Sequence, residues 1–292
     1  MKSESWRVGS IRVTCIPEQD RIPGMKALLP EATPDALAEI PWLRPHFVTT
    51  DGKLKASIHA FVVETEERCI LVDTCIGNDK PRSYAGWNHL QGPFLTRLSD
   101  AGYPTERIDT VLCTHMHVDH VGWNTCWRNG RWVPTFPEAR YLFGRMELAH
   151  WQAEIESGTS EDGLDQGQVF ADSIQPVLDA GLAVFVDAPY EVCTGVRLVP
   201  TPGHTPGHVS VELRSEGAGA FITGDIMHHP CQIARPHWAA SADVEPTLAM
   251  ATRRQVLADV AASGELVLGS HFAAPTAGRV VRDGDSFRLL TD

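Results

Sequence analysis

Three histidines and an aspartate fall within six residues near the middle of the chain, in the run Thr114-His115-Met116-His117-Val118-Asp119-His120. Neutral imidazole and carboxylate are the donors that zinc, iron and manganese sites use. Packing so many of them into one small volume is unfavourable unless a cation holds them. Ligands on one face of a helix would stand three or four residues apart, which is not the spacing here. The run therefore predicts a metal site on a loop after a strand at residues 108–114.

The pattern His115-x-His117-x-Asp119-His120 resembles the signature of the metallo-β-lactamase superfamily. The resemblance covers about residues 57–275, and it implies an α/β fold in the form of a four-layer αβ/βα sandwich. It also implies three more metal ligands downstream, which are a His, a bridging Asp and a last His. The matching positions are His204 in Thr201-Pro202-Gly203-His204-Thr205-Pro206-Gly207-His208, Asp225 at the end of Phe221-Ile222-Thr223-Gly224-Asp225, and His271 at the end of Leu266-Val267-Leu268-Gly269-Ser270-His271.

The same resemblance divides these ligands between two divalent metal ions. It implies that His115, His117 and His204 bind the first ion, that Asp119, His120 and His271 bind the second, and that Asp225 bridges both. Zinc is the usual metal of the superfamily, although iron, manganese or cobalt would accept the same ligands. Two neighbouring cations lower the pKa of a shared water, so we expect a dimetal-bound hydroxide as the nucleophile. Asp73, at the end of an apolar strand, is implied to hold a ligating imidazole through its second nitrogen.

Within the superfamily, the whole pattern looks most like the branch of N-acyl-homoserine lactonases and methyl parathion hydrolases. The lactonases usually have a Tyr three residues after the bridging Asp, whereas this chain has His228. We expect His228 to stabilise a developing oxyanion or to protonate the leaving alkoxide, with a pocket-wall or supporting role as the alternative. Asp119, Asp225 and His228 are thus the predicted catalytic residues. The expected reaction is the opening of a lactone or the cleavage of a small carboxylic ester, and the alternative is phosphotriester hydrolysis.

Other classes share the metal motif. A glyoxalase-type thioesterase would need basic residues for a glutathione carboxylate, and the candidates are Arg253, Arg254, Arg279 and Arg282. A sulfur dioxygenase would use a single iron and consume oxygen. A metal-binding sensor without turnover is the alternative outside enzymology, but all seven ligand positions hold residues that can ligate. A secreted zinc β-lactamase is disfavoured because the N-terminus lacks the apolar segment of a signal peptide.

Composition narrows the partners of this 292-residue chain. Its 43% hydrophobic content and eight tryptophans indicate a globular protein, which we expect to be one domain over residues 1–292. A net charge of −12 argues against nucleic acid or an anionic membrane as a partner. The resemblance implies a small hydrophobic lactone or ester as the substrate. Seven cysteines without a C-x-x-C pair suggest reduced, buried thiols and a cytoplasmic location.

Two segments leave alternatives open. The proline-rich insertion at about residues 17–56, with a helix from Pro34, could form a lid, a pocket wall, an arm of a homodimer or a plain surface extension. Trp123, Trp127 and Trp132 could wall a hydrophobic pocket or fill a hairpin around Asn129-Gly130. Strands are predicted at residues 8–16, 57–65, 69–74, 140–143, 183–186 and 196–199, and helices at 94–101, 145–152, 173–180 and 246–262.

Overall fold

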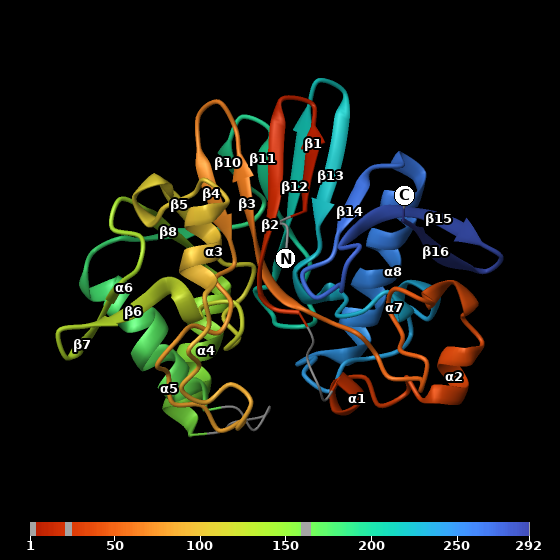
Figure 1. Ribbon diagram of the computed structural model, residues 1–292, viewed down its shortest axis with the longest axis horizontal. Coiled ribbons are helices and arrows are strands. Elements are labelled where there is room, and N and C mark those ends of the chain that lie inside the picture. Colours follow the sequence, from red (N-terminus) through yellow and green to blue (C-terminus); the bar gives the residue numbers. More distant parts are fainter. Residues whose placement is uncertain (1–3, 21–24, 159–164, 292) are drawn as a thin grey trace.

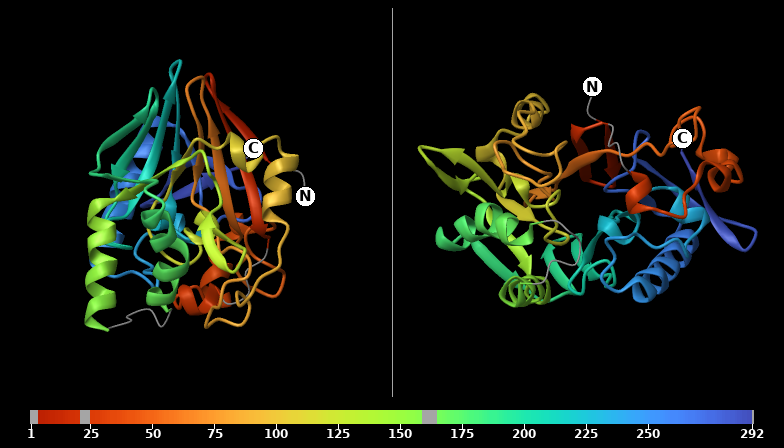
Figure 2. Two further views of the ribbon diagram at one scale, coloured as in Figure 1. Left: turned by 90° about the vertical axis from the view of Figure 1, so that its left-hand side faces the viewer. Right: turned by 90° about the horizontal axis from the view of Figure 1, so that it is seen from below.

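Two sheets and the helices that cover them make up the chain (Figures 1 and 2). The structure is a computed structural model that describes residues 4–20, 25–158 and 165–291. Within those ranges, two seven-stranded sheets face one another, and helices lie on their outer sides. The order of the layers is therefore helix, sheet, sheet, helix, which confirms the predicted four-layer αβ/βα sandwich.

The first sheet comes from the N-terminal half of the chain. Its strands from β4 to β9 are parallel, and the others are antiparallel. Its helices lie at the left of Figure 1. In spatial order the strands are β1 (Ser5–Val8), β2 (Ile11–Gln19), β3 (Ile58–Glu64), β4 (Cys69–Val72), β5 (Thr110–Leu112), β8 (Arg140–Gly144) and β9 (Ala183–Val186). The helices of this half are α3 (Phe94–Asp100), α4 (Arg145–Ser157), α5 (Gln166–Val169), the π-helical η4 (Phe170–Ile174) and α6 (Gln175–Asp179).

The second sheet comes from the C-terminal half and is antiparallel apart from the β13–β14 pair. Helix α8 begins with Pro246, whose fixed φ suits the first helical turn, and ends at Gly264 with φ 68°. In order, the strands are β10 (Tyr190–Cys193), β11 (Val196–Pro200), β12 (Val209–Ser215), β13 (Ala218–Ile222), β14 (Leu266–Leu268), β15 (Ala277–Asp283) and β16 (Ser286–Leu290). The helices are α7 (Cys231–Ala234) and α8 (Pro246–Ser263).

The apolar core lies in three layers between these elements. The middle layer joins the facing sides of the two sheets through residues such as Val63, Val72, Val211 and Ile222. The outer layers lie under the helices of each half. Strand β3 is buried at six of its seven positions, because both faces of its sheet are covered. This explains its continuous apolar sequence.

Most predicted elements are present, with different ends. The predicted opening strand is a hairpin instead, because Gly9 turns the chain between β1 and β2 with φ 58°. The predicted helix at 173–180 begins earlier, at Gln166, through a π-helical turn. The helix at 94–101 and the long helix from Pro246 are confirmed. The Gly- and acid-rich sequence at residues 157–168 predicts an exposed loop, but Gln166–Val169 form α5, and residues 159–164 lie outside the described residues.

The insertion at about 17–56 lies against the C-terminal half, below α7 in Figure 1. It holds α1 (Met25–Leu28), α2 (Pro34–Ala38) and the 3-10 turn η1 (Pro41–Leu43), while residues 21–24 lie outside the described ranges. Thr33 caps α2 by accepting from the Ala36 N–H at 3.3 Å, and the helix begins at Pro34, as predicted. Phe47 of this segment packs edge-on against Phe272 and His229. The insertion is therefore anchored beside the loop that follows Asp225.

The helices of the described ranges include none with the length and apolarity needed to span a bilayer.

Candidate metal centre

All seven predicted ligands lie at one edge of the two sheets. This edge is where β5, β13 and β14 end, and where the loop from β11 to β12 passes. Loops after β5, β13 and β14 carry His115 to His120, Asp225 and His271, and the β11–β12 loop carries His204. Strands that end at the same edge bring their following loops together, so ligands from 115 to 271 share one site.

The first group consists of His115, His117 and His204. The distance from His117 Nδ1 to His115 Nε2 is 3.0 Å, and to His204 Nε2 it is 2.9 Å. Asp225 Oδ2 lies 3.8 Å from His115 Nε2 and 3.7 Å from His204 Nε2. Three imidazole nitrogens and a carboxylate thus converge on one point, and all four side chains are buried.

The second group consists of Asp119, His120 and His271. The Nε2 atoms of His120 and His271 lie 3.2 Å apart, and Asp119 is 3.8 Å from the first and 3.6 Å from the second. Asp225 reaches this group also, at 3.3 Å from His120 and 3.2 Å from His271. Its carboxylate therefore stands between the two groups, which is the place of a bridging ligand. The Asp119 side chain is 15% exposed and is the most accessible of these groups.

The donor set fits divalent cations. Burial, and then the neighbouring imidazoles, hold the pKa values of His115 and His204 well below the usual value, so these rings are neutral and offer lone pairs. Burial opposes protonation of His120, but Asp225, Asp73 and Asp119 outweigh it and raise that pKa well above the usual value. The carboxylates of Asp73, Asp119 and Asp225 therefore favour a bound cation at this place. Asp225 Oδ1 is buried and accepts no hydrogen bond, which leaves it free to ligate.

Asp73 lies where the resemblance implied. Its Oδ2 is 2.9 Å from His120 Nδ1, and its carboxylate also accepts the Thr114 N–H at 2.7 Å. Asp73 has a left-handed backbone with φ 59°, which Asp tolerates better than most residues. With Nδ1–H donated to Asp73, His120 points Nε2 into the second group.

His228 lies inside the same cluster. Its Nε2 is 3.2 Å from Asp225 Oδ2, and its ring is stacked on His271 at 5.9 Å between centroids. Its Nδ1 is buried and has no hydrogen-bond partner. His228 could therefore contact a bound molecule through Nδ1, or join His204 and Asp225 as a further ligand.

Glu147, in the first turn of α4, is a buried residue of the site that sequence reasoning missed. It accepts hydrogen bonds from the Met116 N–H at 2.9 Å, the Trp151 indole at 2.7 Å and the Thr205 hydroxyl at 2.7 Å. It therefore joins the loop of His115 and His117 to the loop of His204. A lone Glu at the start of a helix carries no sequence signal for such a role.

Two more supporting residues were missed. His208 accepts the Asp225 N–H at 2.8 Å through Nε2, so the second His of the Thr-Pro-Gly-His repeat holds the backbone that carries the bridging carboxylate. Asp243 lies 2.9 Å from His204 Nδ1, although it stands 39 residues away in sequence. The repeat itself was a signal for His208, whereas Asp243 lies in no motif.

The tryptophans separate into two environments. Trp123 is buried and stacks on Phe94 at 5.8 Å. Trp127 and Trp132 pair across the hairpin of β6 (Thr125–Arg128) and β7 (Arg131–Pro134), and Trp127 is 49% exposed. The hairpin alternative therefore describes Trp127 and Trp132.

Arg253, one of the four arginines of the thioesterase alternative, is fully buried and donates to the carbonyls of Pro236 and Trp238. Its guanidinium is therefore not accessible to the carboxylate of a glutathione substrate. This removes one of the residues on which that alternative depended.

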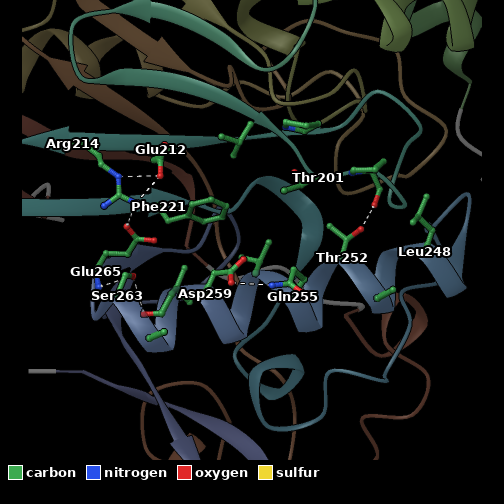
Figure 3. Close-up of a pocket in the computed structure, with 17 residues that line it drawn as sticks. Thr201, Glu212, Arg214, Phe221, Leu248, Thr252, Gln255, Asp259, Ser263 and Glu265 are labelled. Atoms are coloured by element: carbon green, nitrogen blue, oxygen red, sulfur yellow. Dashed lines mark hydrogen bonds and ion pairs between the residues drawn. The ribbon is translucent and has the colours of Figure 1, made fainter.

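A cavity of about 880 Å³ lies elsewhere, between α8 and strands β11–β13 (Figure 3). Thr252, Gln255 and Asp259 of α8 line one wall, and Arg214 and Glu212 lie at one end. Its lining includes none of the seven predicted ligands among the described residues. This cavity is therefore separate from the metal centre.

Comparison with known proteins adds to this geometry. Residues 55–271 match the family described as the metallo-beta-lactamase superfamily. An N-acyl homoserine lactonase of Bacillus thuringiensis is 25% identical over 186 residues, which are 59% of this chain and 65% of the relative. A probable metallo-hydrolase of Mycobacterium tuberculosis is 28% identical over 192 residues, which are 59% of this chain and 57% of the relative. The chain thus spans less than two thirds of the length of these relatives.

Solved structures show the same fold. AidC, a dizinc quorum-quenching lactonase solved with a product, has a TM-score of 0.79 at 20% identity, with 99% of this chain and 97% of that chain covered. The hydrolase AbOPH of the beta lactamase superfamily has a TM-score of 0.78 at 24% identity, with the same coverage. The alignment with each of these two structures includes the N-terminal insertion, since it covers 99% of this chain.

Proposed function

The chain belongs to the metallo-beta-lactamase superfamily, and from this premise we propose that it is a dinuclear metal-dependent hydrolase that opens a lactone or cleaves a small carboxylic ester. The observation that carries the proposal is the position of Asp225, whose carboxylate lies within 3.8 Å of imidazoles from both ligand groups. A single-metal site would not need two groups that share one buried carboxylate.

His115, His117 and His204 would hold one ion, and Asp119, His120 and His271 the other, with Asp225 between them. We propose zinc, because imidazole and carboxylate donors suit it and the structural neighbour AidC is a dizinc lactonase. A pair of such cations lowers the pKa of water and polarises the carbonyl under attack. No Ser, Cys or Lys nucleophile is required.

The side chains supply positioning and proton transfer. The partly exposed Asp119 carboxylate can accept the proton that the attacking water gives up. The His208 ring holds the backbone of Asp225 by accepting its N–H, which supports the position of the carboxylate in the site. The burial of the cluster excludes bulk water, which strengthens each electrostatic contact.

His228 would act on the substrate oxygens. With Nε2–H donated to Asp225 at 3.2 Å, a proton on the unpartnered Nδ1 can be donated to a developing oxyanion or to the leaving alkoxide. Ring opening of a lactone produces an alkoxide that remains attached to the product, so a nearby proton donor is useful in this reaction.

The substrate is proposed to be a small hydrophobic lactone, because relatives of the chain are N-acyl homoserine lactonases. The insertion packs close to the metal centre, since its residues Met25, Leu29 and Phe47 are buried in one apolar cluster with Met227, two residues after Asp225. Phosphotriester hydrolysis is the second candidate. His228, in place of the Tyr expected of a lactonase, is the observation that favours it.

Metal analysis and a substrate panel test the proposal together. Purified protein should contain two equivalents of metal and should hydrolyse an acyl-homoserine lactone or a simple γ- or δ-lactone faster than an aryl ester or methyl parathion. The D225N variant should lose at least 100-fold in kcat/KM, while the exposed control D285N keeps the wild-type value. Turnover of methyl parathion alone would favour the second candidate, and one iron without hydrolysis would contradict both.

A further inference from the structure

The two nitrogens of His204 face different partners. Nδ1 lies 2.9 Å from Asp243 Oδ1, and Nε2 lies 2.9 Å from His117 Nδ1 in the first ligand group. If the Nδ1 proton is donated to Asp243, Nε2 keeps its lone pair and points at the proposed metal. The alternative tautomer would direct a proton at the metal position. Asp243 therefore determines whether His204 can ligate.

Asp243 is itself held on both sides. The Ala240 N–H donates to its Oδ2 at 2.9 Å, and the Arg253 guanidinium lies 3.6 Å from the same oxygen. Both side chains of this ion pair are fully buried. The adjoining backbone is fixed also, because the Val244 N–H donates to the His204 carbonyl at 2.9 Å. The carboxylate thus has little freedom to turn away from His204.

Arg253 connects this pair to the segment after Asp225. Its guanidinium donates to the carbonyls of Ile226, Pro236 and Trp238. Arg253 does not line the cavity of Figure 3, into which Thr252, Gln255 and Asp259 of the same helix project. Arg253 therefore projects from a different side of α8 than the residues that line this cavity.

The arrangement repeats the one around the second ligand group. There, Asp73 lies 2.9 Å from His120 Nδ1, the same distance as Asp243 from His204 Nδ1. One carboxylate-held imidazole comes from each half of the sandwich. We propose that Asp243 is the positioning residue of His204 and supports the first metal, as Asp73 supports the second, and that Arg253 holds Asp243 in place. The inference rests on the proposed metal centre.

Zinc affinity tests this assignment without any substrate. Two dissociation constants for Zn²⁺ are measured by chelator competition in the wild type, D243N and D73N. D243N should weaken one of the two by 10- to 100-fold and leave the other within twofold, the range found when partners of ligating histidines are removed. D73N should weaken the other constant. The double variant D73N/D243N should therefore weaken both.

Matched controls come from the same helix. D259N and R254K change exposed residues of α8 and should leave both constants within twofold. R253K keeps the positive charge but cannot donate to three carbonyls in fork geometry, so it should weaken the same constant as D243N by a smaller factor. R253K also tests the proposal if the D243N variant does not fold.

The possible failures are distinguishable. If the wild type binds no zinc, the metal centre and this inference fall together. If the wild type binds two ions and both D243N and R253K bind them equally tightly, only the inference is overturned. A drop in the thermal stability of the metal-free D243N protein with both zinc constants unchanged would also overturn it, because Asp243 would then be purely structural.

Discussion

The carboxylate of Glu147 accepts a hydrogen bond of 2.7 Å from the hydroxyl of Thr205, and so ties helix α4 to the loop that carries His204. The same carboxylate accepts the Met116 N–H within the first metal loop. E147A should lower the free energy of unfolding by about 2–4 kcal/mol, because it leaves buried donors without partners. E147Q should cost less, since its amide oxygen can still accept and its amide N–H can donate to Thr205.

Chemical denaturation of both variants, with metal content measured in parallel, checks this prediction. E156Q is the matched control, because Glu156 lies on the same helix and is exposed. Equal stabilities for E147A and E156Q would show that the two loops do not depend on this carboxylate.

Gly207 is required where α4 meets the same loop. A Cβ atom at this position would lie 2.3 Å from the Glu147 backbone nitrogen and 2.5 Å from its Cα, and neither can move alone. G207A should therefore cost about 1–3 kcal/mol of stability and reduce metal retention. G92A is the control, because its nearest neighbour, Asn78 Oδ1, would be 3.8 Å away. Thermal unfolding of the two variants should separate them clearly, and a G207A variant as stable as G92A would contradict the packing argument.

Sequence predicted those parts of the site that are contiguous or follow an apolar strand. The run from His115 to His120 and the ends of the strands before Asp225 and His271 fall into this class. The structure brings all seven predicted ligands together, and their role as ligands stays a prediction for metal analysis to test. The helix from Pro246 was also predictable, because its apolar residues recur near the helical period.

The rest depends on tertiary contacts. Glu147, Asp243 and Arg253 are isolated charged residues, and only packing reveals that they are buried against the ligand loops. Strand β12 alternates apolar and polar residues but was not predicted. It begins directly after His208, the last residue of the Thr-Pro-Gly-His repeat, and was not distinguished from that motif. The π-helical turn η4 has no periodic signature, because it inserts one residue into a helix.

Metal removal should destabilise the fold as well as abolish hydrolysis. A ligand that binds only the folded state contributes about 2.7 kcal/mol when present at about 100 times its dissociation constant. Two such ions would raise the melting temperature by about 10 °C in a chain of this size. Calorimetry before and after EDTA treatment measures the shift, and added Zn²⁺ should reverse it. EDTA that has been saturated with zinc beforehand should have no effect, and a chelator-insensitive rate would contradict the mechanism.

His229 should make the stability of the protein depend on acid pH. Its Nε2–H donates to the Phe47 carbonyl at 2.9 Å, and its Nδ1 accepts the Cys231 N–H at 3.0 Å, so the neutral ring has no place for a second proton. Burial lowers its pKa from 6.5 to about 4. Between these values the unfolded chain binds a proton that the folded chain refuses, so the free energy of unfolding should fall as the pH falls. The loss is at most about 3 kcal/mol at 1.36 kcal/mol per pKa unit.

H229Q removes the titrating ring and can still donate to Phe47. Its free energy of unfolding, measured by urea denaturation from pH 7 to pH 4 at fixed zinc, should fall less steeply than that of the wild type. Comparing the two proteins at each pH cancels the effect of metal loss, which is common to both. H46Q, which changes an exposed histidine of the same insertion, should follow the wild-type curve. Parallel curves for H229Q and the wild type would contradict this prediction, because they would show that protonation of His229 does not contribute to the loss of stability in acid.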